Sequence, residues 1–137
     1  MTTTYSTDAQ VYARVPLVAK ALARVNAERT SASLSAATLD DYRVEAQTLL
    51  QRDLSARGVE TTAIVDTTSL MEPERLLAAV LVFEAAMVRS DGRAGVPDVF
   101  GDAAKTWRGL YETALATARP RGSDVLPEGS TITWERG

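Results

Sequence analysis

The sequence predicts an all-α protein: a small bundle of three to four helices, followed by a flexible C-terminal tail that can form a strand on a partner. Apolar residues recur at helical spacing along most of the chain, and residues that favour helix starts precede these stretches. Glycine and proline gather in the connections and after residue 120. The 137 residues suit one domain with a core, so we assign residues 1–120 to a helical domain and 121–137 to the tail.

The first predicted helix begins after Thr7, because Thr7 and Gln10 have the spacing of a capping box. Pro16 disfavours helical geometry in the residue before it, so this helix should stop or kink there. Residues 17–25 have a helical composition. Residues 26–37 are rich in serine, threonine and alanine, and we expect them to form a connecting loop.

The second predicted helix has clear signals at both ends. Thr38 is a good N-cap, and Asp40 and Asp41 follow in the first turn, where carboxylates are favoured. Gly58 supplies the left-handed residue that commonly ends a helix. An apolar stripe at i, i+3 and i+4 spacing runs between these ends and consists of Leu39, Tyr42, Ala46, Leu49, Leu50 and Leu54.

Residues 59–68 are expected to be an extended linker, because a lone strand cannot satisfy its own hydrogen bonds. Ser69 and Glu72 then have the spacing of a second capping box. From 76 to 88 the following helix is apolar nearly all round, interrupted only by Glu84, so it must be covered on most sides, with other subunits among its possible neighbours. The residues expected to be buried are Leu77, Val80, Leu81 and Phe83.

The last predicted helix is capped by Asp98 and stopped by Pro120. We interpret its aromatic residues as core residues rather than as a stacking platform, because they fall on the apolar stripe. That stripe consists of Ala104, Trp107, Tyr111, Ala114, Leu115 and Ala118. The residues expected to face outwards are Asp102, Lys105, Arg108 and Glu112.

Cysteine and histidine are absent, which excludes disulfides, cysteine-ligated zinc, thiol nucleophiles and imidazole chemistry. The acidic clusters Asp40–Asp41 and Glu72/Glu74 lie at predicted helix starts, where capping and the helix dipole explain them. We therefore expect no enzymatic activity, no cofactor and no metal site. Glu84 should pair with an arginine of its own or a neighbouring subunit, because an unpaired buried charge is costly.

The net charge of −3 and the scattered basic residues argue against a dedicated DNA-binding domain, since phosphate neutralisation drives most nucleic-acid affinity. The N-terminus lacks the basic and apolar regions of a secretory signal. The most apolar stretch, 76–88, is shorter than the about 20 residues of a membrane span. We expect a protein that is made in the cytoplasm and has no membrane partner.

The tail contains one segment with strong strand propensity, formed by Thr131, Ile132, Thr133 and Trp134. Two interpretations of Trp134 stay open. The tail can fold back so that Trp134 packs on the helices, or it can dock into a partner by strand addition with Trp134 as the anchor.

The order of these parts resembles the head–tail connector proteins of tailed bacteriophages, also called adaptor or head-completion proteins, and their relatives in phage-like gene transfer agents. The resemblance rests on the amphipathic helix from 38 to 58, the very apolar helix at 75–84, the helix at 103–115 and the tail that follows. It covers roughly residues 38–118.

Membership of this family implies a structural virion protein of the neck, without enzymatic activity, made in the host cytoplasm. It forms a homo-oligomeric ring, typically of twelve subunits, beneath the portal protein. The ring extends the DNA channel, through which DNA passes without sequence-specific binding, and contacts a tail-side neck or tail-completion protein. The C-terminal tail reaches towards the portal, which gives the segment from Thr131 to Trp134 a portal-docking role.

The alternative is a helix-turn-helix DNA-binding regulator or a DNA-packaging subunit. Such a protein needs a recognition helix with exposed basic and amide side chains. The second predicted helix offers four candidates, Arg43, Gln47, Gln51 and Arg52. A small carboxylate enzyme is a weaker alternative, because histidine is missing and the acidic residues are not clustered.

Overall fold

The computed structural model describes residues 4–59, 64–66, 68–87, 99–118 and 121–122. This part of the chain is mostly helical, so the all-α class is confirmed. Its α-helices are α1 (Asp8–Arg14), α2 (Val18–Ser31), α3 (Leu39–Ala56), α4 (Met71–Ala86) and α5 (Val99–Thr117). The remaining elements are a short 3-10 helix, η2 (Thr68–Leu70), and two very short strands, β1 (Ile64–Asp66) and β2 (Arg121–Gly122).

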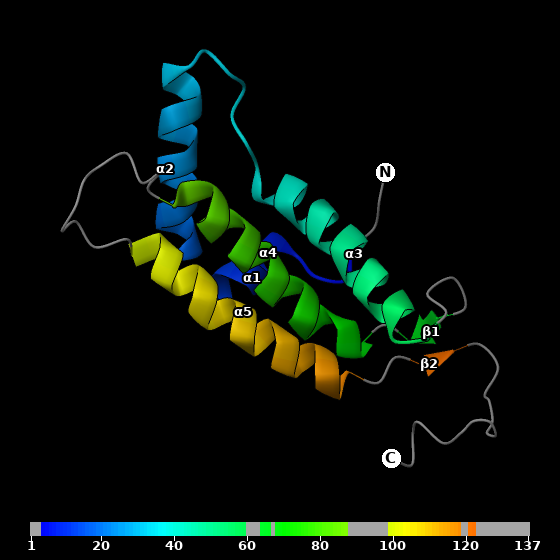
Figure 1. The fold of residues 1–137 in the computed structure, drawn as a ribbon. Coiled ribbons are helices and arrows are strands. Elements are labelled where there is room, and N and C mark those ends of the chain that lie inside the picture. The colour runs from blue at the N-terminus through cyan, green and yellow to red at the C-terminus, as the bar shows by residue number, and fades with distance from the viewer. Residues whose placement is uncertain (1–3, 60–63, 67, 88–98, 119–120, 123–137) are drawn as a thin grey trace.

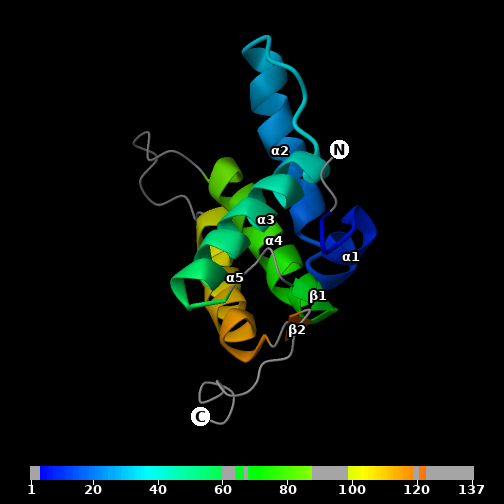
Figure 2. The same ribbon diagram turned by 90° about the vertical axis from the view of Figure 1, so that its right-hand side faces the viewer.

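Helix α4 is the centre of the fold. It contacts α1, α2, α3 and α5, and in Figure 1 it runs between α3 and α5. Figure 2, turned by 90°, shows α2 extending beyond the other helices. The apolar surface of α4 explains this arrangement, since a helix that is apolar nearly all round must be covered on most sides. Helices of the same chain supply that cover.

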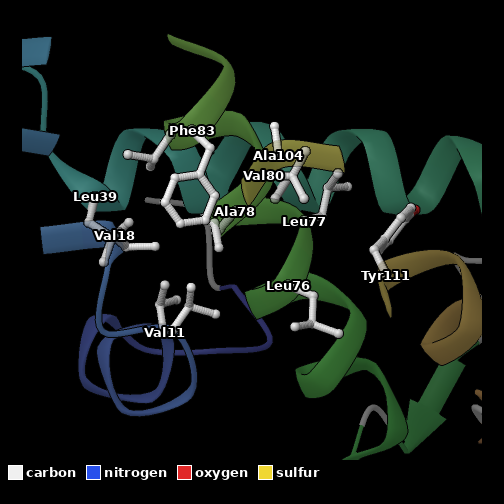
Figure 3. Packing of buried hydrophobic residues seen from close by; sticks show 14 of the residues in the cluster. Val11, Val18, Leu39, Leu76, Leu77, Ala78, Val80, Phe83, Ala104 and Tyr111 are labelled. Carbon is white, nitrogen blue, oxygen red and sulfur yellow. The ribbon is translucent and has the colours of Figure 1, made fainter. Parts of the chain in front are cut away.

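The core forms where the apolar stripes of the other helices meet α4, and Figure 3 shows these side chains gathered around it. Leu77, Val80 and Phe83 are buried as predicted. Leu81 is partly buried and packs against the edge of the core, so it lies less deep than the other three. Trp107 is likewise half-buried at the edge of the core rather than inside it. The fully buried members include Val11, Val18, Leu50, Leu54, Leu76, Leu77, Val80, Phe83 and Tyr111.

Three of the predicted helix-end residues, Thr7, Thr38 and Gly58, are confirmed in the structure. The Thr7 side chain accepts from the backbone of Gln10, and the Gln10 side chain accepts from Thr7, which completes the predicted capping box of α1. Thr38 and Asp41 form the same reciprocal pair at the start of α3. Gly58 has a φ of 85°, the left-handed conformation expected just after a helix.

Residues 26–31 are helical, so the predicted loop from 26 to 37 is too long. Val18, Ala21 and Val25 bury one face of the first half of α2 in the core. Beyond them Ala27, Glu28 and Arg29 are good helix formers, and the Arg24–Glu28 ion pair at i, i+4 spacing joins this stretch to the preceding turn. Asn26 then holds the true loop in place. Its amide donates to the carbonyl of Ala37 at 3.0 Å and accepts from the Ala37 N–H at 2.7 Å.

The connection between α3 and α4 also differs from expectation. Within residues 59–68, predicted to be a linker, Ile64–Asp66 forms β1, and its antiparallel partner is β2 from beyond α5. The predicted capping box of Ser69 and Glu72 is wrong, because η2 leads directly into α4 and the N-cap residue is Leu70. The Glu72 carboxylate pairs with two arginines instead.

Candidate functional site

The predicted docking residues Thr131, Ile132, Thr133 and Trp134 lie outside the described residues. The structure does place the start of the tail, residues 121–122. Gly122, in β2, pairs with Ile64 of β1, and β1 precedes η2 and the start of α4. The tail therefore leaves the helical body close to the N-terminal end of its central helix, as Figure 1 shows.

The four side chains proposed for a recognition helix do not form an exposed row on α3. Arg43 and Gln47 are 9% and 7% exposed. Gln51 is half-buried and donates from its amide to the Tyr5 hydroxyl at 3.0 Å. Only Arg52 among the four is largely exposed. Three of the four side chains thus face the protein, where they cannot read base edges.

Glu84 pairs with an arginine, as predicted. The Arg108 guanidinium of α5 lies 2.9 Å from a Glu84 carboxylate oxygen. Both side chains are 41% exposed, so Glu84 is not buried and the expected burial cost does not arise. An exposed pair of this kind contributes at most about 1 kcal/mol.

Among the described residues, the buried carboxylate is that of Glu74, which its place in the sequence indicated only as part of a helix start. It is fully buried, and it accepts three hydrogen bonds from the N-terminal segment. The donors are the Tyr5 N–H at 3.1 Å, the Ser6 N–H at 2.8 Å and the Ser6 hydroxyl at 2.5 Å. These bonds fasten the segment before α1 onto α4.

Arg43 fastens the same N-terminal segment from the side of α3. Its guanidinium lies 2.7 Å from a carboxylate oxygen of Asp8 and 2.6 Å from one of Asp40. It also donates to the Thr4 hydroxyl and to the carbonyl of Ser6. Because its donors have partners from α1, α3 and the N-terminal segment, its burial is compensated.

The environments of Glu74 and Glu72 shift their pKa values in opposite directions. Burial raises the pKa of Glu74, although the hydrogen bonds from Ser6 and Tyr5 oppose it. For Glu72 burial also raises the pKa, but hydrogen bonds and charge from Arg14 and Arg75 outweigh it and lower the pKa overall. The oxygens of Glu74 are occupied by N-terminal donors, so its role here is structural.

Helical spacing in the sequence does not identify Glu74 as buried. It lies three and four residues before Leu77 and Ala78, both of which are buried. Glu84 likewise lies four residues after the fully buried Val80, yet it is exposed. What distinguishes Glu74 is its set of donors on Tyr5 and Ser6, which are remote in the sequence.

A second polar cluster joins α1, α4 and α5. Arg14 lies 3.0 Å from a Glu72 carboxylate oxygen, and Arg75 pairs with the other oxygen. The Arg14 guanidinium also lies over the ring of Trp107, 5.1 Å from its centroid, in a cation–π contact. Trp107 is therefore an edge residue that packs on the core and stacks with an arginine.

Among the described residues, no three acidic side chains come close enough together to hold a metal ion. In the same part of the chain, every helix is too short or too polar to cross a membrane. Comparisons of the chain with protein-family models, curated proteins and solved structures found no match.

A groove of about 310 Å³ opens where α2 ends and α3 begins. Burial in its wall raises the pKa of Tyr42, against the opposing charge of Arg29. Leu34, on the loop between the two helices, is 55% exposed beside it. The groove is lined by Val25, Glu28, Arg29, Leu34, Tyr42 and Ala85.

Proposed function

We propose that this chain is a structural virion protein that forms a ring beneath the portal, joins head to tail and extends the DNA channel. The observation that carries the proposal is the order of α3, α4 and α5. It follows the order of parts on which the resemblance to head–tail connector proteins rests, over residues 38–118. Buried charged side chains support a structural role, because Glu74 and Arg43 hold the N-terminal segment to α4 and α3.

The proposed partners are further copies of this chain, the portal protein and a tail-side neck or tail-completion protein. A twelve-subunit ring in the virion neck is the assembly proposed, with DNA passing through it without sequence-specific binding. Thr131, Ile132, Thr133 and Trp134 are proposed to add as a strand to the portal. Successive side chains of a strand alternate, so Ile132 and Trp134 would share one apolar pocket.

A ring requires two different complementary faces on each subunit. The exposed large apolar side chains of the described residues supply candidate contacts from three parts of the fold. Leu34 lies in the loop after α2, Met87 directly follows α4, and Val99 and Leu110 belong to α5. Because α4 is already covered within the chain, these residues are better candidates for the faces between subunits than the central helix.

Electron microscopy of the purified chain mixed with its cognate portal tests the proposal. The expected result is a closed ring of copies on the tail-side face of the portal, accompanied by the matching mass of the assembled particle. A particle that contains only two-fold-symmetric dimers would overturn the ring. A gel shift of linear DNA at moderate salt, without portal binding, would favour the DNA-binding alternative.

A further inference from the structure

The groove between α2, α3 and α4 has the chemistry to hold an aromatic side chain. Val25, Leu34 and Ala85 provide apolar lining, and the ring of Tyr42 adds an aromatic wall. Its volume of about 310 Å³ is at the lower end of the about 300–1,000 Å³ range of ligand pockets. Such a groove suits one large side chain rather than a folded partner.

Two charged side chains at the groove, Glu28 and Arg29, can orient a side chain that binds there. The Glu28 carboxylate pairs with Arg24 at 3.2 Å through one oxygen, and as an acceptor it can also receive an N–H from an occupant. The Arg29 guanidinium donates to the carbonyl of Ser35 at 2.5 Å through Nε, the hydrogen bond that the structure gives this side chain. Its terminal nitrogens can therefore donate to a carboxylate.

The C-terminal tail contains a residue pair that complements these groups. Trp134 is the largest apolar residue after 122, and its indole N–H is a donor that prefers an acceptor when buried. Glu135 follows it directly and supplies a carboxylate. Glu28 at the groove is an acceptor suited to the indole N–H, and Arg29 is a cation suited to the Glu135 carboxylate.

The tail is long enough to reach the groove of its own chain. Gly122 lies next to β1, near the start of α4, whereas Ala85 lies in the last turn of α4. The tail must therefore span at least the length of the 16-residue helix α4, which is about 24 Å. Trp134 follows Gly122 by 12 residues, a stretch that reaches about 40 Å when extended.

We propose that, before assembly, Trp134 is stowed in this groove of its own chain and is released when the tail docks. The release step rests on the portal-docking part of the proposed function, whereas the stowed state does not. A tethered segment acts at an effective concentration of about millimolar, so at micromolar protein the groove takes its own tail in preference to that of another copy. Stowing would keep the strand-forming segment from pairing with other copies before the portal is present.

Tryptophan fluorescence of the full chain tests the stowed state. The spectrum of the Trp134→Phe variant, subtracted from that of the parent, isolates Trp134 without altering Trp107. The expected result is blue-shifted emission and several-fold weaker acrylamide quenching than in a synthetic peptide of residues 128–137. Emission and quenching equal to those of the peptide would overturn the proposal.

Ala85→Arg supplies the decisive variant, because it fills the groove from an exposed position on α4. The matched control is Ala27→Arg, an exposed position of α2 that does not line the groove. Ala85→Arg should raise Trp134 quenching towards the peptide value, with unchanged circular dichroism, and Ala27→Arg should leave it unchanged. Equal effects of the two variants would overturn the groove as the site.

Dilution separates the chain's own tail from that of a second copy. A stowed tail of the same chain gives quenching that is constant from about 50 to 0.5 μM, whereas loss of protection over that range would overturn the assignment to the same chain. Portal binding is measured separately. If neither the parent nor the variants bind the portal, the proposed function fails while the fluorescence result stands. If the parent binds the portal, Ala85→Arg should bind it more tightly than the parent does.

Discussion

The hydroxyl of Tyr111 in α5 donates a hydrogen bond of 2.6 Å to a carboxylate oxygen of Asp53 in α3. These two helices lie on either side of α4, so the bond joins the outer elements past the central one (Figure 1). Tyr111 is 2% exposed. Burial and the Asp53 carboxylate both raise its pKa well above the ordinary value of 10.0.

Tyr111→Phe should destabilise the protein by about 1–2 kcal/mol, because it removes a hydrogen bond to a charged group and keeps the buried ring. Urea unfolding followed by circular dichroism measures the change. Asp53→Asn and the double variant complete a cycle, whose coupling energy should be at least about 0.5 kcal/mol. Strictly additive effects would show that the bond contributes nothing.

Alkaline pH should weaken the same contact. The folded pKa of Tyr111 lies above its unfolded value, so its neutral hydroxyl contributes stability below about pH 10, and this contribution is lost as the pH rises beyond that value. The parent should therefore lose more stability than Tyr111→Phe between pH 9 and 11. Parallel losses in the two proteins, measured by thermal unfolding, would contradict the assignment.

Lowering the pH should change the stability of the fold in opposite directions through the two glutamates at the start of α4, Glu72 and Glu74. The lowered pKa of Glu72 gives stability that is present above its ordinary value of 4.5 and is lost as the pH falls below it. The raised pKa of Glu74 gives the reverse, because the folded state takes up this proton more readily. Glu72→Gln should reduce the loss of stability below pH 4.5, and Glu74→Gln should remove a gain between pH 7 and 4.5. Urea midpoints across this range measure both slopes.

Two leucines of α4 with different burial, Leu77 and Leu81, test the packing of the core. Leu77 is 2% exposed, so Leu77→Ala should cost about 2–5 kcal/mol through lost burial and the cavity that remains. Leu81→Ala removes the same atoms from a half-buried position and should cost less than half as much. Equal costs, measured by denaturant unfolding, would mean that the packing of α4 is different from that described.

The sequence was informative where the determinants are local. The capping box at Thr7 and the N-cap at Thr38 were predictable because the residues that form them lie close together in the sequence. Glu74 was not recognised as a buried carboxylate because its donors on Ser6 lie 68 residues away. The β1 strand was missed for the same reason, since its partner follows α5.

In the candidate site, too, the sequence identified what depends on local residues and not what depends on contacts remote in the sequence. The strand propensity of Thr131 to Trp134 is a local property, so the segment could be selected from sequence. The groove is formed by α2, the loop after it, α3 and α4, and no local pattern brings Val25, Tyr42 and Ala85 together. The loop at Leu34 was placed too early, because the serine, threonine and alanine content of residues 26–37 indicated a loop although Ala27, Glu28 and Arg29 favour the helix that continues to Ser31.

Deleting residues 130–137 tests the role of the tail in attachment. The buried core found among the described residues lies in the helices, so the truncated chain should keep the circular dichroism of the parent. Attachment should be abolished, because the strand of Thr131, Ile132 and Thr133 and the Trp134 anchor are removed together. Co-sedimentation with portal-bearing heads measures it.

A matched control separates strand addition from side-chain anchoring. Trp134→Ala keeps the strand-forming backbone and should weaken attachment strongly, as expected for a buried aromatic at the centre of an interface. Thr131→Pro keeps Trp134 but removes one backbone donor and should weaken attachment through the lost strand hydrogen bond. Full attachment of the truncated chain would refute the docking role and leave Trp134 as a packing residue of the groove.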